Sequence, residues 1–110
     1  DCSHEPLTGC YRDGCCNTDV DDVGLHTVCA KVNMRFLEFL KETGNDLITS
    51  TPDFGFPGLK DNDSWCVCAA SSAQAIKVGL ACPIYLSKTN AKTLELIPLE
   101  ILKKYAIDLY

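Results

Sequence analysis

Cysteines are the residues of this chain whose type and spacing best suit them to chemistry, since eight occur among 110 residues. A thiolate is both a nucleophile and a soft metal ligand. Cys15 and Cys16 are adjacent, and Cys66 and Cys68 are two residues apart. Neither pair fits the geometry of a disulfide, so the spacing favours thiols or metal ligands over the up to four disulfides that an even count permits. We expect one side chain of the adjacent pair to point inward and the other outward.

A metal site is one interpretation of the C-x-C motif, because a short strand over residues 65–69 would present both of its sulfurs on one face. Histidine and a further cysteine would supply the remaining ligands, and we expect zinc or iron as the cofactor of such a site. The competing interpretation is that these cysteines fill core space, because C-x-C lacks the loop that folds two sulfurs around one ion. The metal candidates are His26, Cys29, Cys66 and Cys68.

A catalytic thiol is a second interpretation. A reactive cysteine needs a base beside it, and His26 lies three residues before Cys29. In a strand these side chains would point to opposite faces, so a catalytic pair requires the histidine to belong to the preceding turn. The alternative is a structural histidine that only makes a hydrogen bond. The candidates for this site are Cys15, Cys16, His26, Cys29, Cys66 and Cys68.

Residues 45–64 form a long segment without periodicity, which in a small protein is often functional. Its glycines and aromatic rings allow the backbone to approach a ligand, or to pack on the protein's own core. We expect this loop to be ordered without a ligand, because Asn45 and Asp46 can bond loop amides. The candidates for ligand binding are Asn45, Asp46, Phe54, Phe56, Lys60 and Trp65.

The spacing of apolar residues predicts the elements that position these side chains. Residues 1–25 have no sustained apolar period and should be mostly loop. Apolar and polar residues alternate from Thr27 to Val32, which predicts a strand. Asn33 and Gly44 then cap the two ends of an amphipathic helix.

The second half of the chain continues this mixture. A capping box at Ser71–Gln74 predicts a helix that Gly79 ends. Residues 83–86 and 93–97 are predicted strands, and Pro98 opens a final helix. The order predicts a small α+β domain over residues 1–110, with a short β-sheet packed by about three helices and long ordered loops.

Charge and hydropathy limit the partners. The formal net charge of −5 repels phosphate backbones and the basic residues are scattered, so we expect no nucleic acid partner. No apolar run approaches the roughly 18 residues of a membrane span, so we expect no membrane partner. A small-molecule ligand remains, and the oligomeric state stays open. The spacing of the cysteines favours a cytoplasmic protein, with secretion after removal of a leader as the alternative.

Four motifs together resemble a family of small proteins, chiefly bacterial with algal members, known as a domain of unknown function: "LTGCYRDGCC", "GLHTVCA", "GNDLITSTPDFGFPGLK" and "WCVCA". The resemblance extends from Cys2 to Tyr105 and implies a cytoplasmic-type protein with no established activity. The chain departs from the family pattern at Ser71, Ser72 and Asn90, where the family often has Arg, Trp and His, and at Cys10 and Cys82. The pattern covers Gly14, Cys15, Cys16, His26, Thr27, Cys29, Asn45, Asp46, Pro52, Gly55, Pro57, Gly58, Trp65, Cys66 and Cys68.

Two irregular segments, residues 13–29 and 45–68, both end in predicted strands that carry cysteines. Pairing of those strands would bring the segments together into one polar, cysteine-rich cleft. The hypothesis is a thiol or metal site there, either enzymatic or sensing. The alternative is a non-catalytic module that binds a small ligand or partner and whose cysteines are structural.

Overall fold

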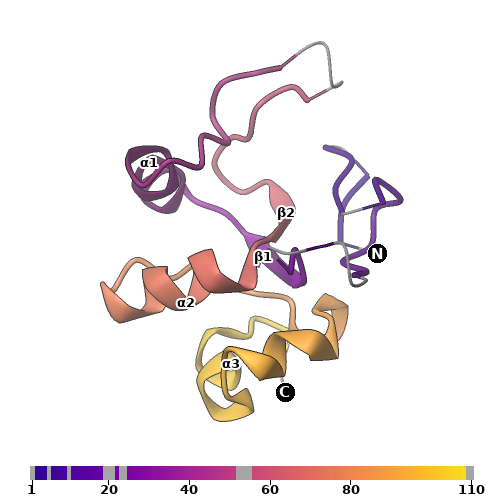
Figure 1. The fold of residues 1–110 in the computed structure, drawn as a ribbon, viewed down its shortest axis with the longest axis vertical. Coiled ribbons are helices and arrows are strands. Elements are labelled where there is room, and N and C mark those ends of the chain that lie inside the picture. Colours follow the sequence, from indigo (N-terminus) through magenta and orange to yellow (C-terminus); the bar gives the residue numbers. More distant parts are fainter. Residues whose placement is uncertain are drawn as a thin grey trace.

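A computed structural model describes residues 2–4, 6–9, 11–18, 22, 25–51 and 56–108. Their elements follow in the order β1, α1, β2, α2, the 3-10 helices η2 and η3, and α3 (Figure 1). Three α-helices and a two-stranded antiparallel sheet confirm the predicted α+β class for the part of the chain described. None of the helices in the described ranges has the length and hydrophobicity of a membrane span.

The sheet consists of β1 (Val28–Lys31) and β2 (Ser64–Val67), as the alternating patterns predict. The strands are antiparallel, and Cys29 lies opposite Cys66. The predicted pairing of the two cysteine-bearing strands is therefore confirmed. On the other edge of β1, Ala30 makes an isolated bridge with Ile84.

The predicted strand over residues 83–86 is wrong, because the chain leaves the sheet after this bridge and forms η2 (Leu86–Lys88). The carboxylate of Asp108 accepts hydrogen bonds from the amides of Leu86 at 2.7 Å and Ser87 at 3.0 Å. These bonds hold the chain in a turn where an extended strand was expected.

Helix α1 (Met34–Glu42) has the predicted caps. The side chain of Asn33 accepts a hydrogen bond from the amide of Phe36 at 2.9 Å. Gly44 follows the last turn with φ of 101°, the left-handed region that favours glycine. The helix buries Phe36, Leu37 and Leu40.

Helix α2 (Ala69–Lys77) begins two residues before the predicted capping box, and Cys68 is its N-cap residue. Ala69 is fully buried and its amide donates to the carbonyl of Leu25 at 2.9 Å, so β2 passes directly into the helix. Tertiary packing here outweighs the local capping pattern. The predicted end at Gly79 is confirmed by its φ of 77° after the C-cap.

The predicted strand over residues 93–97 is also wrong, since η3 (Ala91–Glu95) occupies most of it. The side chain of Asn90 caps this turn through the amide of Lys92, and the hydroxyl of Thr93 bonds to that of Thr27 at 2.7 Å in the interior. Helix α3 (Leu99–Tyr105) follows. Pro98 is its N-cap residue, so the helix begins one residue after Pro98, the predicted first helical position.

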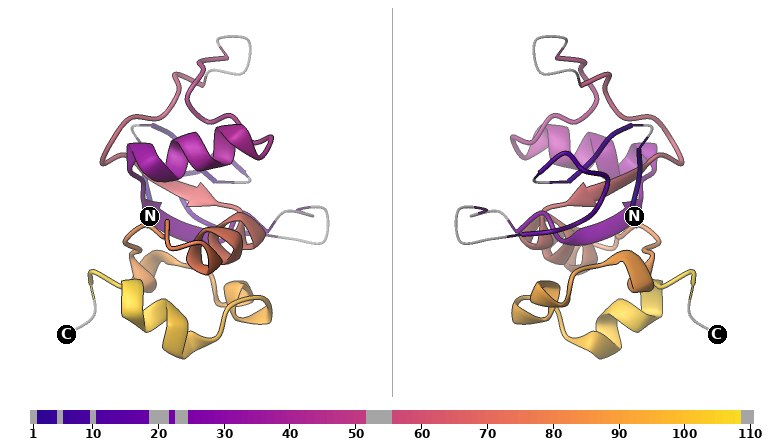
Figure 2. Two further views of the ribbon diagram at one scale, coloured as in Figure 1. Left: turned by 90° about the vertical axis from the view of Figure 1, so that its left-hand side faces the viewer. Right: turned by 90° about the vertical axis from the view of Figure 1, so that its right-hand side faces the viewer.

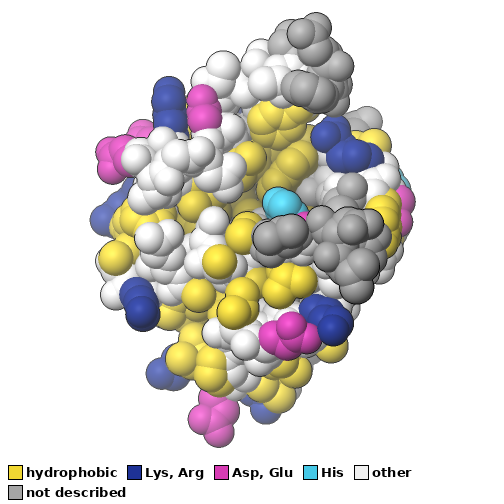
Figure 3. Space-filling view, in the orientation of Figure 1, with side chains coloured by type: hydrophobic (Ala, Val, Ile, Leu, Met, Phe, Trp, Pro, Cys, Tyr) yellow, Lys and Arg dark blue, Asp and Glu magenta, His cyan; other side chains and the backbone are white. Residues whose placement is uncertain are grey.

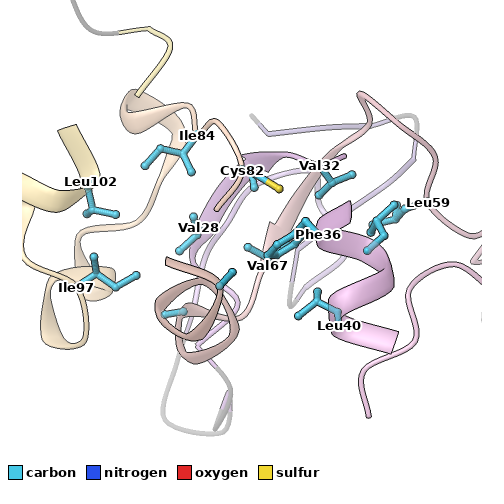
Figure 4. Close-up of a cluster of buried hydrophobic side chains, with 14 of the residues drawn as sticks. Val28, Val32, Phe36, Leu40, Leu59, Val67, Cys82, Ile84, Ile97 and Leu102 are labelled. Atoms are coloured by element: carbon cyan, nitrogen blue, oxygen red, sulfur yellow. The ribbon is translucent and has the colours of Figure 1, made fainter. Parts of the chain in front are cut away.

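The hydrophobic core joins β1, β2, α1 and the C-terminal segment. Figure 4 shows Val28, Phe36 and Val67 pointing toward the same interior as Ile84 and Leu102. Large side chains buried in this way contribute roughly 1.5 to 3 kcal/mol each. The segment with α3 lies at the opposite end of the molecule from the loop between α1 and β2 (Figure 2). The N-terminal segment meets β2 where the hydroxyl of Thr8 accepts a hydrogen bond from the amide of Cys66.

Candidate functional site

A cleft of about 200 Å³ opens where the N-terminal segment, the turn before β1, the start of the long loop and β2 meet. Figure 3 shows histidine and basic side chains beside hydrophobic surface on one face of the molecule. The cleft brings together parts of both irregular segments, as the sequence hypothesis requires. It is lined by Gly9, Arg12, His26, Asn45, Leu47, Trp65, Cys66, Val67 and Cys68.

His26 belongs to the turn before β1, the position that a catalytic role requires. Its Nδ1 atom lies 2.7 Å from Oδ1 of Asp22, and its amide donates to Oδ2 of the same carboxylate at 2.9 Å. Thr18 donates a third hydrogen bond to Asp22 at 3.0 Å. A carboxylate beside Nδ1 keeps the proton of a neutral imidazole on that nitrogen, so Nε2 is left as the basic nitrogen.

Asp22 is ionised in this setting. Burial raises the pKa of its carboxyl group, but the hydrogen bonds from His26 and Thr18 lower it more, and the net pKa lies below the ordinary value of 3.8. The side chain of Asp22 is 3% exposed, whereas that of His26 is 46% exposed. The carboxylate is thus a fixed anchor, and the imidazole is the partner that solvent and ligands can reach.

Cys68 lies beside this pair. The hydrogen bond between the amide of Ala69 and the carbonyl of Leu25 joins the residue after Cys68 to the residue before His26. Both side chains line the same cleft, and Cys68 is half-buried at the N-terminus of α2. A cysteine and a histidine thus line one cavity, and the histidine is bound to a buried aspartate.

Arg12 supplies a positive charge to the cleft. Its guanidinium carbon lies 5.9 Å from the centroid of the Trp65 ring, a cation–π contact. Trp65 in turn packs against Phe56, with ring centroids 5.2 Å apart. A guanidinium group held in this way can pair with a carboxylate or phosphate of a ligand.

Two disulfides lie next to the cleft, Cys2–Cys29 and Cys16–Cys66, and all four cysteines are buried. They correct the expectation that thiols or metal ligands prevail over disulfides. The close spacing argued only against bridges within a pair, whereas these bridges join residues 27 and 50 positions apart. Because Cys16 is bridged to Cys66, it is not joined to the adjacent Cys15, which is half-buried.

The candidate metal set is divided by the fold. Cys29 and Cys66 lie in the buried sulfur cluster, whereas His26 and Cys68 line the cleft without belonging to that cluster. Cys66 also lines the cleft and so lies between the two. Within the described ranges, the residues whose ligand atoms all lie within 4.8 Å of one another are Cys2, Cys16 and Cys66. Cys2 was not among the sequence candidates, because nothing in the loop around it indicates which strand it meets.

The ligand-binding candidates are also divided. Asn45 and Trp65 line the cleft, whereas Lys60 lines a separate open groove. Phe56 is 8% exposed and belongs to the core, and Phe54 lies outside the described residues.

Asp46 caps the loop as predicted, since its Oδ1 accepts hydrogen bonds from the amides of Ile48 at 2.9 Å and Thr49 at 3.1 Å. Hydrogen bonds from Thr49 and the amide of Ile48 lower the pKa of this carboxyl group. Asp46 therefore serves the scaffold of the loop.

Sequence reasoning missed Asp22, Arg12 and Gly9. The four-residue spacing of Asp22 and His26 is the one available signal, but several acidic residues precede this histidine and only the fold selects among them. Gly9 has φ of 103°, and a Cβ atom there would lie 2.3 Å from the carbonyl oxygen of Cys15. The lining of the cleft therefore needs a glycine at this position.

The fold and the cleft define a small α+β protein in which two disulfides hold loops against a two-stranded sheet. A family model described as "uncharacterized protein conserved in bacteria (DUF2237)" matches residues 1–106. The chain belongs to this family, which confirms the resemblance found in its motifs. A search of curated proteins found no match.

Proposed function

We propose that the cleft is a thiol-dependent active site in which Cys68 is the nucleophile, His26 is the general base and Asp22 orients the histidine. The observation that carries this proposal is the 2.7 Å contact between His26 and the buried Asp22, in a cleft that Cys68 also lines. The base and the group that orients it are two of the three parts of a nucleophilic triad.

The reaction class that suits this arrangement is acyl transfer. The sulfur of Cys68 attacks an acyl carbon, and its proton passes to Nε2 of His26. The leaving group takes that proton as the bond to the acyl carbon breaks, and a thioester remains on the cysteine. Water or a second substrate then attacks the thioester and restores the thiol.

Arg12 and Trp65 indicate the character of the substrate. A guanidinium group over an aromatic ring favours an anionic group, and a cleft of about 200 Å³ suits a small molecule. We propose a small acyl compound that carries a carboxylate or phosphate. Asn45 adds a polar side chain to the same lining.

A non-catalytic binding module is the second candidate, and the two disulfides favour it. Four of the cysteines are structural in the oxidised protein, and the buried Phe56 supports the wall that contains Trp65. In that case the cleft would bind an anionic ligand through Arg12 and Trp65 without a covalent step.

Alkylation of the folded, oxidised protein separates the two candidates. Iodoacetamide followed by peptide mapping should label Cys68 before Cys82, because Cys82 is 5% exposed in the core and its pKa is raised to about 11 by burial. His26→Ala should slow labelling of Cys68 by at least roughly tenfold, since a positioned base typically contributes about 100-fold or more.

Arg12→Ala is the matched control, because it removes a side chain from the same cleft but leaves the proposed base in place. It should leave the labelling rate within a factor of about two and weaken binding of anionic ligands. Equal labelling rates in wild type and His26→Ala would contradict the thiol mechanism and favour the binding module.

A further inference from the structure

The two disulfides form one cluster of four sulfur atoms. Cys29 and Cys66 lie directly opposite each other in the sheet, so the bridges to Cys2 and Cys16 arise from neighbouring positions. The Sγ atoms of Cys2, Cys16 and Cys66 all lie within 4.8 Å of one another, and that of Cys29 is bonded to that of Cys2. Exposed fractions of 0 to 7% show that water hardly reaches these side chains.

We propose that the four cysteines of this cluster bind one Zn²⁺ ion when both disulfides are reduced. Zinc–sulfur distances of about 2.3 Å in a tetrahedron place the sulfurs about 3.8 Å apart. The span of 4.8 Å among three of the sulfurs already falls near this value. When a disulfide is reduced, its two sulfur atoms must move apart by less than about 2 Å to reach this distance.

The parts of the chain that carry the ligands allow this adjustment. Cys29 and Cys66 are fixed by the paired strands, whereas Cys2 and Cys16 come from irregular segments. The hydroxyl of the fully buried Thr8 accepts a hydrogen bond from the amide of Cys66 at 2.8 Å, which holds the N-terminal segment beside β2 without the disulfides. The four thiols of the reduced protein should therefore stay close to one another.

Reduction of two disulfides to four thiols takes four electrons and four protons, which two molecules of a dithiol reductant supply as each becomes a disulfide. Zn²⁺ then replaces the four thiol protons, which are released to solvent. Disulfides under oxidising conditions and zinc under reducing conditions would thus join the same loops to the same strands.

This site adjoins the cleft, because Cys66 also lines the cleft, but its ligands are not the residues of the proposed active site. It uses none of Cys68, His26 or Asp22, so failure of one proposal leaves the other intact. It also differs from the metal set predicted from sequence, because it uses Cys2 and Cys16 in place of His26 and Cys68. The two sets share Cys29 and Cys66, and an experiment can tell them apart through the residues that they do not share.

Cobalt provides the test, because tetrahedral Co²⁺ bound by thiolates absorbs visible light and shows a sulfur-to-cobalt charge-transfer band. The full chain is reduced with dithiothreitol, freed of it under anaerobic conditions and titrated with Co²⁺. We expect about one Co²⁺ per chain with a tetrathiolate spectrum that Zn²⁺ abolishes by displacement. His26→Ala and Cys82→Ser should keep the stoichiometry and the spectrum, and Cys16→Ser should lose the tetrathiolate spectrum.

Because Cys16→Ser can also impair folding, the wild-type protein supplies a second measurement. Alkylation of the reduced chain with and without Zn²⁺ should show protection of Cys2, Cys16, Cys29 and Cys66 by the metal. Absence of Co²⁺ binding, or a spectrum without thiolate charge transfer, would overturn the proposal. Loss of binding in His26→Ala together with protection of Cys68 would also overturn it and assign the ion to the cleft.

Discussion

The imidazole of His26 is held by Asp22 through a contact of 2.7 Å between Nδ1 and Oδ1. The carboxylate of Asp22 also accepts a hydrogen bond from the backbone amide of the same histidine. One buried carboxylate therefore fixes both the ring and the main chain of His26. A turn before a strand would otherwise leave the ring several rotamers. The imidazole is thus fixed at the lining of a cleft that Cys68 also lines.

Replacing Asp22 with Asn keeps the shape of the side chain and removes its charge. We expect the free energy of unfolding at neutral pH to fall by about 1 to 3 kcal/mol, the usual effect of weakening hydrogen bonds to a buried charged group. Urea denaturation followed by circular dichroism measures this change. A variant as stable as the wild type would mean that the carboxylate does not anchor the turn.

The same substitution has a defined dependence on pH. The pKa of Asp22 in the folded protein lies below 3.8, so its stabilisation is complete above that pH and is lost as the pH falls through the folded pKa. The difference in unfolding free energy between wild type and Asp22→Asn should therefore shrink as the pH falls from about 7 to about 3. A difference that stays constant over this range would contradict the assignment.

Cys82 should make the protein less stable in alkali. Burial raises the pKa of its thiol from 9.0 to about 11. The folded protein keeps this proton where the unfolded chain has lost it, so the stabilisation is complete below about pH 9 and is lost as the pH rises toward 11. In Cys82→Ala the loss over this range should be smaller than in wild type by roughly 2 to 3 kcal/mol. If the unfolding free energies of the two proteins fell equally over this pH range, burial would not raise the pKa of this thiol.

The local parts of the fold were predictable from sequence, and the long-range parts were not. Asn33 and Gly44 cap α1 through bonds and backbone angles within a few residues, which sequence patterns record directly. The start of α2 was misplaced because the capping box competes with the buried Ala69, and the tertiary contact prevails.

In the candidate site, too, the residue types were predictable from sequence and the long-range contacts were not. Its cysteines and His26 were recognisable by residue type, but the pairing of bridges depends on the register of the two strands and on the path of the N-terminal segment. Asp22 could not be chosen from sequence, because its role depends on a turn that has no periodic pattern.

The disulfide Cys16–Cys66 should contribute strongly to stability, because it closes a loop between residues 50 positions apart. The double variant Cys16→Ser, Cys66→Ser should lose about 2 to 4 kcal/mol by the effect of loop closure on the unfolded chain. Chemical denaturation of the oxidised protein measures this loss. Adding dithiothreitol should then destabilise the wild type more than the double variant, and equal effects would contradict a structural bridge.

Gly9 and Gly44 offer a matched pair of substitutions. Their φ angles are 103° and 101°, but a Cβ atom at Gly9 would lie 2.3 Å from the carbonyl oxygen of Cys15, whereas one at Gly44 meets nothing within 4 Å. Gly44→Ala should cost about 1 to 2 kcal/mol of unfolding free energy through backbone strain alone. Gly9→Ala should cost clearly more and should also slow alkylation of Cys68, because the lining of the cleft must move. Equal losses of unfolding free energy in the two variants would contradict this, because the backbone at Cys15 would then move aside at little cost.

An acyl donor tests whether Cys68 carries out covalent chemistry with His26 as its base. Wild-type protein in its oxidised form is mixed with p-nitrophenyl acetate, the release of p-nitrophenolate is followed, and the acetylated residue is located by mass spectrometry. We expect a burst of about one equivalent per chain, with the acetyl group on Cys68, and a burst rate that falls at least roughly tenfold in His26→Ala. No burst, acetylation spread over surface lysines, or the same rate in His26→Ala would contradict it.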